Sequence, residues 1–140
     1  MKTSECRYCT CPNFLAGTVA RKIEKMAAES WKETGLAPSH AYLLLLTLEE
    51  PGIQAGIIAQ HLQLTPSTIT RLVEKLEERK LVTRVSEGKQ TNVFPTQKAR
   101  EMKPLLKKCS EDFHEKYTEL LGKSDSKQFI QYMTRIADRI

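Results

Sequence analysis

Apolar residues recur every three or four positions along most of the chain, and this period predicts a mainly helical protein. The predicted helices span 14–34, 39–49, 55–62 and 96–121, with one more that begins at Pro66 and a last one from Ser124 to Ile140. Two shorter runs, 81–85 and 91–95, alternate apolar with polar residues, which predicts two strands joined by a turn at Ser86–Gln90. The expected fold class is therefore mainly α with a small β-hairpin.

Local signals mark the ends of several of these helices. Gly35 suits the end of the first helix, and Gly122 the end of the long helix 96–121. Pro104 lies inside that long helix and should kink it, because proline lacks the backbone donor and clashes with the preceding turn. Ser124 is placed to cap the last helix.

The helix that begins at Pro66 has the pattern of a DNA-reading helix. Thr65 can cap its first turn, and proline at the first helical position loses no hydrogen bond. Its apolar stripe consists of Ile69, Leu72, Val73 and Leu76. The opposite side carries small hydroxyls and an arginine, the groups that bond to base edges and phosphates in a major groove. Taken alone, this pattern is more typical of an ordinary solvated amphipathic helix.

The neighbouring segments favour the DNA-reading interpretation. Only Gln63 and Leu64 separate this helix from helix 55–62, so the two are expected to form a helix-turn-helix, and the basic hairpin that follows has the position of a wing. The candidate DNA contacts are Ser67, Thr68, Thr70 and Arg71 near the bases, Lys75 on the phosphate backbone, and Arg84 and Lys89 in the wing. Without the helix-turn-helix beside it, Lys89 would be interpreted as an ordinary solubilising charge.

Charge and composition agree with a DNA partner but do not establish one. The 140-residue chain, a natural length for one domain, has a formal net charge of +5, and 65–108 alone contains eleven Lys or Arg against five Glu. Such a patch binds phosphates in a salt-sensitive way. The longest apolar run, Tyr42–Leu46, is too short to span a membrane, and no signal-peptide pattern opens the chain. We expect a cytoplasmic protein with no membrane partner.

The run LTPSTITRLVEKLEERKLVTRV resembles the recognition helix and first wing strand of MarR-type transcriptional regulators (multiple antibiotic resistance regulators). VFPTQKARE is similar to their second wing strand and the helix after it, and the resemblance covers about 14–140. The wing tip has Glu87-Gly88-Lys89 where the family usually has Asp-x-Arg, and Pro95–Ala99 stands where it often has Leu-Thr-x-x-Gly. The resemblance implies a DNA-binding winged helix-turn-helix, with a weaker wing contact because Lys89 lacks the planar fork of Arg.

The terminal helices keep apolar faces that a small central unit cannot fully cover. We expect a single domain with a cysteine-containing tail at 1–13, dimerisation helices at 14–36 and 100–140, and the DNA-binding unit at 37–99. Dimerisation through the terminal helices is also what the family resemblance implies. A two-fold homodimer places two recognition helices about one DNA turn apart, which predicts a palindromic operator. The alternative is a monomer whose terminal helices pair with each other.

The distribution of the four cysteines is the second unusual feature of the chain. Cys6, Cys9 and Cys11 form a C-x-x-C-x-C cluster, while Cys109 lies far along the sequence. In a cytoplasmic protein this cluster favours redox chemistry or a soft metal such as Zn²⁺, with Cys109, a histidine or a partner subunit as a candidate fourth ligand. Part of the MarR-type family senses oxidants through a cysteine near the start of the first helix, which by resemblance is close to Cys11. The alternatives are an inert tail and, for Cys109, a core residue on an apolar helical face.

No G-x-S-x-G, Walker or dinucleotide-binding motif is present, so we expect no enzyme. The predicted function is a sequence-specific double-stranded DNA-binding transcriptional regulator. It would be a repressor that is released by a small-molecule inducer, or by oxidation or metal binding at the N-terminal cysteines. The alternative is a thiol- or metal-handling protein, or a protein-interaction module, that uses a winged helix as a scaffold.

Overall fold

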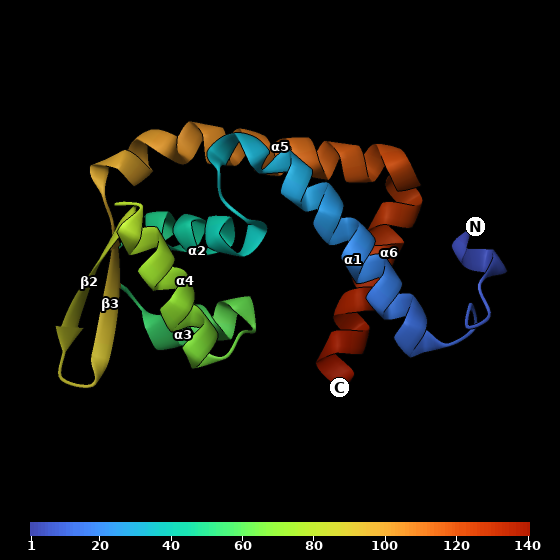
Figure 1. Cartoon of the computed structure of the whole chain (residues 1–140), viewed down its shortest axis with the longest axis horizontal. Coiled ribbons are helices and arrows are strands. Elements are labelled where there is room, and N and C mark those ends of the chain that lie inside the picture. The colour runs from blue at the N-terminus through green and yellow to red at the C-terminus, as the bar shows by residue number, and fades with distance from the viewer.

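The computed structural model describes residues 1–140 and contains six α-helices and a three-stranded antiparallel sheet (Figure 1). The helices are α1 (Pro12–Ser30), α2 (Pro38–Glu49), α3 (Ala55–Leu62), α4 (Pro66–Glu78), α5 (Gln97–Leu121) and α6 (Lys123–Arg139). The strands are β1 (Ile53–Gln54), β2 (Val82–Glu87) and β3 (Gln90–Pro95), and two short 3-10 helices, η1 (Thr3–Glu5) and η2 (Lys32–Thr34), flank α1. None of the helices combines the length and the apolar character that crossing a membrane requires.

The long helix α5 joins two parts of the molecule. In Figure 1 it runs across the top, and α2, α3, α4 and the β2–β3 hairpin lie beneath its first half. The terminal helices α1 and α6 descend from the other part of α5, at the right of the view. Gly122, with a φ of 81°, occupies the turn between α5 and α6, where a side chain would be strained. The DNA-binding unit predicted from the sequence and the two terminal helices therefore lie on opposite sides of the molecule.

β3 is the central strand of the small sheet, whose order is β1-β3-β2. Its pairing with β2 runs from Val82↔Pro95 to Glu87↔Gln90, and its pairing with β1 includes Ile53↔Val93. The amide nitrogen Nε2 of Gln54 also donates to Oε1 of Gln90 at 3.2 Å. The hairpin is thus attached through β1 to the start of α3.

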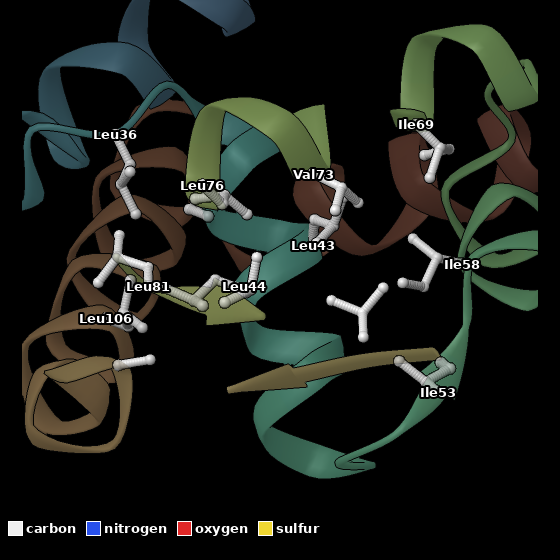
Figure 2. Close-up of a cluster of buried hydrophobic side chains, with 14 of the residues drawn as sticks. Leu36, Leu43, Leu44, Ile53, Ile58, Ile69, Val73, Leu76, Leu81 and Leu106 are labelled. Carbon is white, nitrogen blue, oxygen red and sulfur yellow. The ribbon is translucent and has the colours of Figure 1, made fainter. Parts of the chain in front are cut away.

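A single apolar cluster holds the winged part together (Figure 2). Leu43 and Leu44 of α2 have no exposed surface and lie at its centre. Val73 of α4 lies beside Leu43, and Leu106 of α5 points in from the other side. Burying each such side chain contributes about 1.5 to 3 kcal/mol to folding, so the orientation of α4 is determined by the side it buries.

The predicted fold class is confirmed, and most predicted helices agree closely with the structure. Helix 55–62 and the start of α4 at Pro66 agree residue for residue. The first helix is shorter than predicted, because α1 ends at Ser30 and the 3-10 helix η2 continues the chain to Gly35. Gly35 has a φ of 69°, the left-handed conformation that explains why glycine ends this segment.

Two local predictions are wrong, and one strand was missed. The hairpin continues to Glu87 and resumes at Gln90, so its tip is the pair Gly88-Lys89, with a φ of 63° at Gly88, rather than the predicted five residues. Ser124 does not cap α6, which begins at Lys123 without a side-chain cap hydrogen bond. β1 has only two residues, too few to show an alternating pattern in the sequence.

Candidate nucleic-acid interface

Hydroxyl side chains fix the N-terminus of α4. Thr65 Oγ1 accepts a hydrogen bond from the backbone N–H of Thr68 at 3.3 Å, as the predicted cap requires. The hydroxyls of Ser67 and Thr68 lie 3.2 Å and 2.9 Å from the same oxygen. The cap satisfies one of the free N–H groups of the first turn, and the positive end of the helix dipole is at this end. The first turn is therefore a preformed, electropositive element.

The predicted contact residues on α4 lie on the side opposite the core. Ser67, Thr70, Arg71 and Lys75 are exposed, whereas Thr68 is half-buried. Residues four apart lie on one face of a helix, so Arg71 is flanked by Ser67 one turn before it and Lys75 one turn after it. The Thr70 hydroxyl donates to the carbonyl oxygen of Pro66 at 3.0 Å and keeps its lone pairs for an external donor. The structure thus brings these predicted residues together on one face of α4.

The C-terminal end of α4 is held by contacts that the sequence did not suggest. The Arg79 guanidinium donates to the carbonyl oxygen of Gly35 at 2.5 Å, and Lys98 Nζ donates to the carbonyl oxygen of Arg79 at 3.0 Å. These bonds join α4 to the turn before α2 and to the first turn of α5. Because Arg79 and Gly35 are 44 positions apart, no local pattern could have indicated this contact.

Arg84 of β2 is bound to α4, although the sequence assigned it to DNA. Its guanidinium donates two hydrogen bonds to the carboxylate of Glu77, at 2.9 Å and 3.3 Å, and lies 3.9 Å from Glu74. The hydrogen bond to Arg84 lowers the pKa of Glu77, and the same bond raises the pKa of Arg84. The pair links the wing to α4, but it is partly exposed, with side-chain exposures of 34% for Arg84 and 39% for Glu77, so it adds little stability.

The wing tip is open to solvent. Glu87, Gly88 and Lys89 are all exposed, and Lys89 is the cation at the end of the hairpin. β2 lies against α4, and the hairpin runs beside that helix (Figure 1). Of the two predicted wing cations, Lys89 is therefore available to a phosphate, while Arg84 already has a partner.

His40 of α2 lies half-buried beside the basic end of α4. Its pKa is lowered from the ordinary value of 6.5, first because burial penalises the imidazolium and then because Lys75 and Arg79 repel its charge. A neutral imidazole is consequently the form that the folded protein favours at this position.

The structure does not bring the four cysteines into one site. Cys109 is 2% exposed and belongs to the apolar cluster, and burial, together with Glu33 and Asp112, raises the pKa of its thiol. Cys6, Cys9 and Cys11 are half-buried near the N-terminus, ahead of α1. No set of three or more His, Cys, Asp or Glu side chains is arranged to hold a metal ion. Cys109 is therefore a core residue, the alternative that its apolar helical face suggested.

An apolar groove separates the two terminal helices. It has a volume of about 760 Å³ and is lined from α1 by residues such as Ile23 and from α6 by Phe129, Met133 and Ile136, with Tyr42 of α2 and Phe113 of α5 completing its wall. A smaller apolar hollow of about 390 Å³ lies between α1, the end of α5 and α6. Along α6, Met133 and Ile136 are 41% and 56% exposed. The apolar faces of the terminal helices are therefore partly exposed to solvent in the single chain.

Comparison with known proteins shows that part of this chain is similar to one family of regulators. A family model described as "MarR family" matches residues 34–90. Among curated proteins, an uncharacterised HTH-type transcriptional regulator of Bacillus subtilis, YybA, is 25% identical over 98 residues, which are 68% of this chain and 65% of that protein. The HTH-type transcriptional repressor MdtR of the same species is 25% identical over 74 residues, 53% of this chain and 48% of that protein. The chain thus spans less than two thirds of the length of either relative.

Solved structures agree over almost the whole chain. The structure of CouR from Rhodococcus jostii RHA1 bound to p-coumaroyl-CoA has a TM-score of 0.76 and 25% identity, and covers 98% of this chain and 95% of that one. The structure of the S. aureus MepR–DNA complex has a TM-score of 0.79 over 91% of this chain and 96% of that one, and at 16% identity it shows a shared fold. The terminal helices as well as the winged unit are therefore part of the common architecture.

Proposed function

We propose that this chain, whose residues 34–90 match the MarR family model, is a sequence-specific double-stranded DNA-binding transcriptional repressor of that family. The observation that carries the proposal is the geometry of α4. The helix has a capped first turn, buries Ile69, Val73 and Leu76, and exposes an aligned set of hydroxyl and basic side chains beside a hairpin. MepR, a protein of the same fold, has been crystallised with DNA.

In this proposal the N-terminal half of α4 enters the major groove. Arg71 donates two hydrogen bonds to a guanine, and Ser67 and Thr70 bond to neighbouring base edges or phosphates. Thr68 acts mainly through the cap, because its hydroxyl already contacts Thr65. Lys75 and Lys89 neutralise phosphates, the first beside the helix and the second from the wing tip. Arg84 acts through the helix–wing angle rather than through DNA.

A homodimer follows from the uncovered terminal helices. The groove between α1 and α6 and the exposed apolar side chains of α6 match what a second copy of the chain would bury. The terminal helices, about 14–36 and 100–140, would then form the dimer part, and 37–99 the DNA-binding unit. A two-fold dimer presents two α4 helices to successive major grooves and requires a palindromic operator.

Release from DNA would require an event that changes the spacing of the two α4 helices. One candidate is a small apolar ligand held between the dimer part and the DNA-binding unit. Ligand binding by a protein of this fold is illustrated by CouR, which was solved with p-coumaroyl-CoA bound. The other is oxidation or metal binding at Cys6, Cys9 and Cys11. The second candidate function is a thiol- or metal-handling protein, or a protein-interaction module, that uses the winged helix as a scaffold. It would apply if the chain bound no DNA.

The test compares Arg71→Ala with Lys89→Ala in binding to DNA from the chain's own upstream region, at several salt concentrations. We expect Arg71→Ala to weaken specific binding by about 1 to 3 kcal/mol and to relax the preference at one base pair. Lys89→Ala should weaken binding to all DNA sequences alike. It should also reduce the salt dependence of the binding constant by about the amount of one phosphate contact.

Arg21→Ala, a change at an exposed arginine of α1, is the matched control and should leave binding unchanged. Operator binding that survives Arg71→Ala would overturn the placement of α4 in the groove. No binding to any palindrome at low salt would overturn the regulator proposal as a whole.

A further inference from the structure

The three N-terminal cysteines occupy two consecutive tight turns. The backbone N–H of Cys9 donates to the carbonyl oxygen of Cys6 at 3.2 Å, and that of Cys11 donates to the carbonyl oxygen of Tyr8 at 2.9 Å. Cys6 directly follows η1, and its thiol donates to the carbonyl oxygen of Lys2 at 3.6 Å. The segment is therefore a folded loop in which Cys6 and Cys9 are the first and last residues of one turn.

This turn places Cys6 and Cys9 within the reach of a disulfide. The Cα atoms at the two ends of a β-turn are less than about 7 Å apart. A disulfide joins residues whose Cα atoms are about 4.4 to 6.8 Å apart. Both thiols are half-buried, so neither is enclosed in the apolar core as Cys109 is. The pair thus has the spacing and the access that an intramolecular disulfide needs.

Cys11 has a different position. It is the residue before the first turn of α1, and its carbonyl oxygen accepts the backbone N–H of Leu15 at 3.0 Å. The start of the helix therefore holds its backbone in place. The turn that contains Cys6 and Cys9 lies outside α1 and can adjust without breaking helical hydrogen bonds.

The same loop is in contact with α1. Lys22 Nζ donates to Thr3 Oγ1 at 3.2 Å, and the rings of Tyr8 and Phe14 lie 6.1 Å apart between centroids. Leu15 and Ala16, which follow directly in α1, line the apolar groove. The N-terminal segment that contains the cysteines is thus in contact with the helix that forms one wall of the groove.

We propose that Cys6 and Cys9 form a reversible intramolecular disulfide when a peroxide oxidises the protein. One thiol attacks the O–O bond and becomes a sulfenic acid, while the peroxide leaves as an alcohol or water. The second thiol then attacks the sulfenic sulfur, the S–S bond forms, and one water is released. Two electrons and two protons pass from the two thiols to the peroxide and its products. An effect of this disulfide on operator binding rests on the proposed function, but its formation does not.

The experiment uses the full chain, hydrogen peroxide as the oxidant and peptide mass spectrometry after blocking of free thiols. Trypsin cleaves after Lys2, Arg7 and Arg21, so Cys6 leaves on the peptide 3–7 while Cys9 and Cys11 leave together on 8–21. We expect these two peptides to be joined after oxidation, with the loss of two hydrogen masses, and to separate again after dithiothreitol. On a non-reducing gel the oxidised protein should run as a single chain.

Three variants assign the bond. Cys11→Ser should retain the link between the two peptides, whereas Cys9→Ser should lose it, and Cys109→Ser should leave it unchanged. A link that persists in Cys9→Ser, a bond between two chains, or thiols that all remain open to alkylation after peroxide would each overturn the proposal. Elemental analysis of the purified protein adds one outcome, because a stoichiometric metal held by these thiols would also overturn it.

Operator binding by the reduced and the oxidised protein is measured separately. A disulfide that forms in a protein without DNA binding would contradict the proposed function and leave this inference intact. A protein that binds its operator but forms no Cys6–Cys9 link would contradict this inference and leave the proposed function intact.

Discussion

At the scale of single residues, the protonation of His40 should make the stability of the protein depend on pH. Its pKa in the folded protein lies below 6.5, so above that pH the imidazole is neutral in both the folded and the unfolded chain. As the pH falls through about 6.5, the unfolded chain gains a proton that the folded chain resists. We therefore expect the free energy of unfolding to decrease on acidification in this range, and His40→Gln to remove that part of the decrease. Urea unfolding at a series of pH values between 5 and 8 measures both.

His61→Gln is the matched control for this prediction, since His61 is exposed on α3. Its pH profile should follow that of the wild-type protein. If His40→Gln left the slope between about pH 5 and 6.5 unchanged, the packing of His40 against Lys75 and Arg79 would not be that of the structure.

At the scale of elements, the pair Arg84–Glu77 joins the wing to α4. We expect Arg84→Ala and Glu77→Ala to change stability little, because the pair is exposed, but to lower operator affinity by about three- to tenfold each. If both act through the helix–wing angle, the double variant should lose no more than either single variant. Binding constants for the four proteins in the cycle, with unfolding curves as the stability check, test this expectation.

Two outcomes would contradict it. Losses that add up in the double variant would mean that Arg84 contacts DNA independently, as the sequence alone suggested. A loss in Arg84→Ala that Arg84→Lys fully restores would mean that charge, rather than the two-bond geometry, is what matters, because Lys lacks the planar fork.

The elements that the sequence predicted well are those determined by neighbouring residues. The Thr65 cap, Pro66 and the apolar stripe of α4 all lie within one segment, so their pattern identified the helix and its exposed face. The contacts of Arg79 with Gly35 and of Lys98 with Arg79 depend on how distant segments meet, and no periodicity encodes them. Arg84 is a residue type that often contacts DNA. Its carboxylate partner, Glu77, becomes visible only in the structure, where β2 packs against α4. Glycine at 122, rather than serine at 124, precedes α6 because the chain reverses there.

At the scale of the whole molecule, the uncovered groove between α1 and α6 predicts a dimer that depends on α6. Ile136 lines the groove and is 56% exposed in the single chain, so a charge there should not disturb the fold of the monomer. In a dimer the same charge would be buried without a partner. We expect Ile136→Glu to weaken self-association by about 2 to 4 kcal/mol, the range of a central interface residue, while its thermal unfolding in the monomeric state stays near that of the wild-type protein.

Gln131→Glu is the matched control, because Gln131 is exposed, is not one of the groove-lining residues and lies on the opposite side of α6. Sedimentation equilibrium of the three proteins should show dimers for the wild-type chain and Gln131→Glu, and monomers for Ile136→Glu at the same concentration. Gel shifts on a full palindrome and on a half-site connect this result to function, since a monomer presents only one α4 to DNA and loses the gain from binding two half-sites together. A wild-type chain that is monomeric, or an Ile136→Glu variant that remains dimeric and binds the full palindrome normally, would show that the groove serves something other than a second copy of the chain.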